Sequence, residues 1–155
     1  MKASTKSAAA AATGVIAGLL TNMPRKTGPT RTRSSAVILV VAAVAYPVAG
    51  GNRALDDNAL RHEVAAVLGT VALAVAAWSL PNRAARAVVA AGWVLHAVFD
   101  QTHTQSAGTI LPPWYPAMCA GFDLAMAAGL ELHSQRCNQA CTLGSARTLA
   151  FPRFG

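Results

Sequence analysis

Four long apolar segments divide the chain, and short polar or basic segments separate them. The apolar segments cover residues 36–50, 64–80, 84–100 and 112–133. Most of them approach the roughly 17–25 residues that a helix needs to cross the hydrocarbon core of a bilayer. The pattern predicts an all-α protein in which residues 36–133 form a four-helix transmembrane bundle.

The two ends of the chain lack a segment of this kind. Within residues 1–35 the apolar run 8–20 is too short to span a membrane comfortably, and a basic linker follows it. We expect residues 1–35 to be a weakly structured, disordered extension and residues 134–155 to be a flexible tail. Two alternatives stay open: a translation start at Met23, and insertion of residues 8–20 as a fifth span, which would move the N-terminus outside.

Composition favours a membrane protein over a soluble one. Hydrophobic residues make up 54% of the chain and charged residues 12%, whereas an ordinary soluble domain has about 25% charged residues. The net charge of +7 raises the question of nucleic acid. However, the lysines and arginines lie between the apolar segments and form no stripe with interleaved aromatic residues. The expected partner is therefore the lipid bilayer, and no nucleic acid.

The distribution of basic residues predicts an orientation. In a four-span bundle the linker before residue 36, the loop around residues 81–86 and the C-terminal tail lie on one side, and they hold most of the arginines. The positive-inside rule places that side in the cytoplasm. We expect a multi-pass protein of the inner (plasma) membrane with both termini cytoplasmic.

Ionisable residues interrupt the last two apolar segments at helical spacing, in steps of three and four residues. The stripe in the third segment comprises Val89, Trp93, His96, Asp100 and His103. The stripe in the fourth comprises Cys119, Asp123, Met126, Leu130 and His133. An ionisable residue in an apolar span costs about 2.5–3.5 kcal/mol and tends to face the bundle interior. The stripes therefore predict a polar pocket between these two helices, which small residues such as Gly121, Ala125 and Gly129 would let approach closely.

This pocket has more than one chemical interpretation. A carboxylate one helical turn from an imidazole can fix its tautomer, or both groups can bind a metal. His96, Asp100 and Asp123 are the candidate catalytic residues, and with His103 they are the candidate ligands of a divalent metal such as zinc. Further candidate pocket residues are Trp93, Tyr115, Cys119 and Glu63. In the alternative interpretation, His96 and Asp123 form a hydrogen-bonded pair that only fixes helix pairing.

The hairpin resembles that of a group of small bacterial integral membrane proteins with four predicted spans. The resemblance covers about residues 60–133 and rests on Gly92, Trp93, His96, Asp100 and His103, followed by Trp114, Tyr115, Cys119 and Asp123. It implies a membrane location and a shared polar site, and no established activity. The inward-facing His and Asp pattern is also similar to that of membrane metal-dependent hydrolases of the ceramidase and progestin-receptor type, which have more spans.

Three function classes follow from these observations. The leading one is a membrane protein whose outward-facing polar pocket binds a small molecule, a lipid headgroup or a metal, any enzymatic activity being metal-assisted hydrolysis. The second is a proton-coupled transporter or channel-like dimer, in which a homo-oligomer completes the path. The third is a structural or accessory membrane protein without a site.

Overall fold

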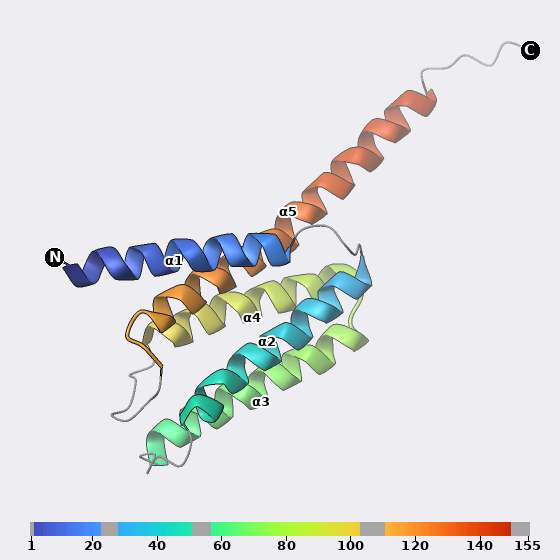
Figure 1. Ribbon diagram of the computed structural model, residues 1–155. Helices are drawn as coiled ribbons and strands as arrows, with labels where there is room; N and C mark the ends of the chain where they lie inside the picture. Colours follow the sequence, from blue (N-terminus) through green and yellow to red (C-terminus); the bar gives the residue numbers. More distant parts are fainter. Residues whose placement is uncertain (1, 23–27, 51–56, 103–110, 150–155) are drawn as a thin grey trace, which may run out of the picture.

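The structure, a computed structural model, describes residues 2–22, 28–50, 57–102 and 111–149, with side chains for 5–22, 28–49, 61–102 and 111–132. The described part of the chain forms five helices (Figure 1): α1 (Lys2–Thr21), α2 (Pro29–Gly50), α3 (Asp57–Ser79), α4 (Asn82–Thr102) and α5 (Tyr115–Leu149).

The all-α prediction is confirmed, but the number of helices is not four. The segment predicted to be a weakly structured extension contains α1, and α2 begins at Pro29 instead of residue 36. The predicted flexible tail is helical as far as Leu149. Neither proline nor glycine occurs between residues 134 and 143, so no strong helix breaker ends α5 in that stretch.

Helix α4 lies at the centre of the arrangement, where it contacts α2, α3 and α5. Its buried face includes Val89 and Trp93, both 0% exposed, which pack with Met126 and Leu130 of α5 in the hydrophobic core. The indole Nε1 of Trp93 donates a hydrogen bond of 2.9 Å to Ser35 Oγ of α2. This buried bond fixes the rotation of α4 against α2, because the indole N–H would otherwise have no partner.

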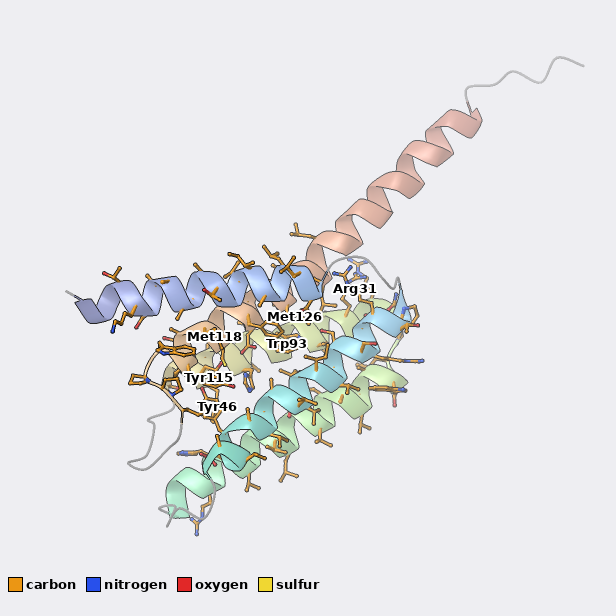
Figure 2. All side chains as sticks on the ribbon, viewed as in Figure 1. Arg31, Tyr46, Trp93, Tyr115, Met118 and Met126 are labelled. Carbon is orange, nitrogen blue, oxygen red and sulfur yellow. The ribbon has the colours of Figure 1, made fainter. Side chains whose placement is uncertain are left out.

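The two ends of the bundle differ in their polar residues. Tyr46 and Tyr115 lie close together at one end, and Arg31 lies at the other (Figure 2). Below, these are the tyrosine end and the arginine end. Helices α2 and α4 run from the arginine end to the tyrosine end, and α3 and α5 run back.

Helix α1 packs along the first half of α5 and runs in the same direction (Figure 1). Gly14 faces Met118 and Phe122, and Gly18 faces Phe122 and Ala125. A Cβ atom on either glycine would collide with the α5 backbone. Two small residues four positions apart are typical of closely packed membrane helices. Gly121 likewise faces Ala11 of α1, and Gly129 faces Asn22, the residue after α1, so the prediction that they line the seam with the preceding helix is wrong.

A hydrogen-bonded cluster joins α1, α2 and α5 at the arginine end. Asn22 Nδ2 lies 3.1 Å from Ala125 O, and Arg31 Nη2 lies 3.0 Å from Asn22 Oδ1 and 3.1 Å from Gly129 O. The end of α1 is thus tied to both neighbouring helices, so α1 is an integral part of the bundle.

Among the described residues, two helices are long and apolar enough to cross a membrane by length and composition. They comprise Pro29–Ala49 in α2 and Arg61–Ser79 in α3. Both overlap predicted spans, whereas the predicted spans 84–100 and 112–133, in α4 and α5, are not among them.

The close approach of α1 and α5 predicts the effect of a larger residue at Gly18. A Cβ there would lie 2.7 Å from Phe122 O, so Gly18→Leu should lower the free energy of unfolding in detergent by about 1–3 kcal/mol. Gly69→Leu is the matched control, because a Cβ at Gly69 meets nothing within 4 Å. Equal stability of the two variants would contradict this packing.

Candidate metal centre

Three ionisable side chains converge between α4 and α5 near the tyrosine end. His96 and Asp100 lie one turn apart on α4, and Asp123 faces them from α5. His96 Nδ1 lies 2.8 Å from Asp123 Oδ2, which is a hydrogen bond, and 3.7 Å from Asp100 Oδ2. The three side chains are at most 5% exposed. The predicted inward orientation of these residues is therefore confirmed.

The packing of the seam brings these groups together. One turn before His96, the Trp93 ring packs edge to face on Phe122 of α5, with ring centroids 5.8 Å apart. Because Trp93 is also held by Ser35, neither α4 nor α5 can rotate freely about its axis. The described parts of the stripes predicted at three- and four-residue spacing do face each other at Trp93, His96, Asp100 and Asp123; His103 and the side chain of His133 lie outside the described residues.

Several polar atoms of this cluster lack a hydrogen bond. These are His96 Nε2 and both carboxyl oxygens of Asp100. The Tyr46 phenol and the Asp123 carboxyl are the polar groups that interact with Asp100 from α2 and α5. A buried polar atom without a partner costs about 1–3 kcal/mol, so the cluster keeps lone pairs that a further group can use.

One ligand atom from each of His96, Asp100 and Asp123 lies within 4.8 Å of the other two. A metal ion placed among such atoms would need only small movements to reach bond lengths of about 2.0–2.2 Å. One imidazole nitrogen with two carboxylates suits Zn²⁺ and also Mn²⁺ or Fe²⁺, because imidazole and carboxylate ligands together fit these borderline ions. The donor set therefore fits a divalent metal.

A cavity of about 210 Å³ adjoins the cluster. Its lining comes from four helices: Gly14 and Ala17 of α1, Ala42 and Tyr46 of α2, His96 of α4, and Tyr115, Met118, Cys119, Phe122 and Asp123 of α5. No lysine or arginine is among the described residues that line it. Among the described lining residues, His96 is therefore the one basic side chain that can offset the acidic groups beside the cavity.

The remaining predicted site residues fall in different places. Tyr115 and Cys119 line the cavity. Trp93 belongs to the core below it, and Glu63, 1% exposed on α3, is not among the lining residues. His103 lies outside the described residues.

The sequence reasoning missed the contributions of α1 and α2 to this cavity. The Tyr46 ring packs edge to face on Phe99 and Tyr115, at centroid distances of 5.8 and 6.1 Å. A phenol within an apolar helix usually needs a polar partner, and that requirement is the signal that points to Tyr46. For α1 the signal is the four-residue spacing of Gly14 and Gly18.

Comparisons with protein-family models, curated proteins and solved structures find no match for this chain. The site is therefore interpreted from its own geometry.

The bond between His96 and Asp123 predicts a stability effect. Asp123→Ala leaves His96 Nδ1 buried without its partner at 2.8 Å and should lower the free energy of unfolding by about 1–3 kcal/mol. Glu131→Ala is the control, since Glu131 is an exposed carboxylate on the same helix and its loss should change stability by less than about 0.5 kcal/mol. Denaturant titration in detergent measures both. A stable Asp123→Ala protein would show that the pair does not hold α4 to α5.

Proposed function

We propose that this chain is an integral membrane protein that binds a divalent metal ion at His96, Asp100 and Asp123. The adjoining cavity admits a small molecule or a lipid headgroup. The observation that carries the proposal is the convergence of three buried ligand atoms within 4.8 Å.

The distribution of side chains supports a bilayer location. Large apolar residues point outward on all five helices: Ile16, Val41, Leu68, Leu95 and Leu124 are each more than half exposed. Polar side chains such as Ser35, Glu63 and Asp100 are buried instead. Exposed apolar surface of this extent needs an apolar environment. Helix α4 is less apolar than α2 and α3 because its sequence contains ionisable residues, of which His96 and Asp100 lie in the interior.

The parallel course of α1 and α5 revises the proposed orientation. With five spans the two ends of the chain lie on opposite sides of the membrane. The arginine end carries the basic linker and the loop before α4, so the positive-inside rule places it in the cytoplasm. The tyrosine end, the metal centre and the N-terminus then face outward.

Charge supports metal binding over a purely structural role. Two carboxyl groups and one imidazole are buried together without a lining lysine or arginine. The imidazole can offset one carboxylate at most, and an uncompensated buried charge is costly. A divalent cation offsets that charge and uses the oxygens of Asp100 that lack hydrogen bonds.

The cavity volume narrows the class of ligand. About 210 Å³ lies below the roughly 300–1,000 Å³ of sites for drug-sized molecules. The cavity suits a small molecule or one headgroup. If the protein is an enzyme, metal-assisted hydrolysis is the reaction that this arrangement supports, because a bound metal lowers the pKa of water to about 7.

Proton transfer is a second candidate, favoured by one observation. His96 lines this cavity and also a second one of about 230 Å³ between α3 and α4. An imidazole between two cavities, bonded to a carboxyl group, can pass a proton from one to the other.

Metal analysis distinguishes the two functions. Detergent-purified protein should contain about one divalent metal per chain by elemental analysis, or bind added Zn²⁺ or Mn²⁺ in calorimetry. Asp100→Asn and His96→Gln should each weaken binding by at least about tenfold, because each removes one of three ligands.

The matched control for these variants is Glu131→Gln, which removes the same charge from an exposed position. It should bind metal like the wild type. A metal-free wild type that also fails to bind added metal would refute the metal proposal and leave proton transfer, which uptake of protons by liposomes would then test.

Labelling of single cysteines tests the proposed orientation. In a background where Cys119, Cys137 and Cys141 are replaced by serine, an impermeant maleimide added to intact cells should label Ser4→Cys and not Arg83→Cys. Labelling of both or of neither would contradict a five-span topology, because α1 would not then cross the bilayer.

A further inference from the structure

A second polar cleft lies at the arginine end and shares no lining residue with the cavity beside the metal centre. Its cavity of about 30 Å³ is lined by Gly28, Arg31, Thr32, Asn82, Arg86 and Leu130. The metal proposal does not use any of these residues. No carboxylate is among the described residues that line this cleft.

Two guanidinium groups from different helices face this cleft. Arg31 of α2 is held in place, because its Nη2 donates to Asn22 Oδ1 and to Gly129 O. Arg86 of α4 has a buried Nε without a hydrogen-bond partner. Two like charges in one small cleft repel each other, and a guanidinium N–H buried without a partner is costly. An anion bound in the cleft would offset the repulsion between the two guanidinium groups and would accept a hydrogen bond from Arg86 Nε.

The backbone at the cleft reinforces this preference. Helix α2 begins at Pro29 and α4 begins at Asn82, so residues at the start of both helices border the cleft. Helix N-termini carry a partial positive charge, which favours phosphate-type anions. In α2 this charge acts without free N–H groups at Pro29 and Arg31, because Pro29 has no N–H and Arg31 N donates to Gly28 O at 3.2 Å. Gly28, with a φ of 67°, supplies the turn that leads into α2.

We infer that Arg31 and Arg86, with Thr32 of α2 and Asn82 of α4, form a binding site for a phosphate group. The volume of about 30 Å³ holds about two water-sized atoms, which matches two phosphate oxygens and leaves the rest of the ligand outside. The planar guanidinium fork suits two such oxygens at once. The phosphate belongs either to an anionic phospholipid of the leaflet at this end or to a free phosphate ion.

The test compares two neighbouring arginines in the detergent-purified full chain. Binding of phosphatidylglycerol, phosphatidylcholine and inorganic phosphate is measured by thermophoresis for the wild type and for Arg86→Gln. Arg86→Gln should bind phosphatidylglycerol or inorganic phosphate, whichever the wild type binds, at least about tenfold more weakly than the wild type, because the variant loses a charge-assisted contact. Arg83→Gln is the matched control, since Arg83 is exposed and lies outside the cleft lining; it should stay within about twofold.

The ligands distinguish the two sources of phosphate. Preference for phosphatidylglycerol over phosphatidylcholine without competition from inorganic phosphate assigns the site to a lipid headgroup, and competition by inorganic phosphate assigns it to a free ion. Arg86→Lys keeps the charge should Arg86→Gln fail to fold, and it should show an intermediate loss because it lacks the fork. Equal weakening by Arg83→Gln and Arg86→Gln, or no weakening by either Arg86 variant, would overturn the proposal.

Discussion

The hydrogen bond of 2.8 Å between His96 and Asp123 is the contact on which the arrangement of α4 and α5 depends. It requires the polar side of each helix to face the other. On α5, residues two positions from Asp123 then lie about 200° around the helix, on the opposite side. Gly121 and Ala125 occupy those positions and meet α1. When Asp123 is buried toward α4, Gly121 and Ala125 therefore face α1, which can pack closely against α5 because these residues are small.

Helix α1 completes the site because it closes one wall of the cavity. Gly14 and Ala17 line the cavity on the side opposite to α4, and the glycine lets the α1 backbone lie directly on α5. In a bilayer, lipid chains would otherwise reach His96 and Asp123 from this side. The α1 residues that line the cavity, Gly14 and Ala17, are apolar. They lower the local dielectric constant around His96 and Asp123, and opposite charges attract more strongly in a low dielectric.

The sequence predicted the contact between α4 and α5 correctly, because ionisable residues mark the face of each helix that meets the other. The spacing of His96 and Asp100, with Asp123 on the next helix, was enough to predict their convergence, because an ionisable residue in an apolar segment has few alternatives. The same reasoning could not find α1, since its apolar run is short and its packing depends on the small residues of α5, far away in the sequence. Tyr46 was missed for a similar reason: its neighbours Phe99 and Tyr115 come from helices whose relative placement the pattern does not give.

The two ends of the bundle separate opposite charges, and α5 connects them. Asp123 lies in the candidate metal centre, whereas the carbonyl of Gly129, about two turns further along, accepts a hydrogen bond from Arg31. Met126, which lies between them, and Leu130, which follows Gly129, belong to the same core cluster as Trp93, and an apolar core of this kind is too densely packed to deform gradually. A displacement of α5 at the candidate metal centre would therefore be transmitted through this packed core toward the arginine end.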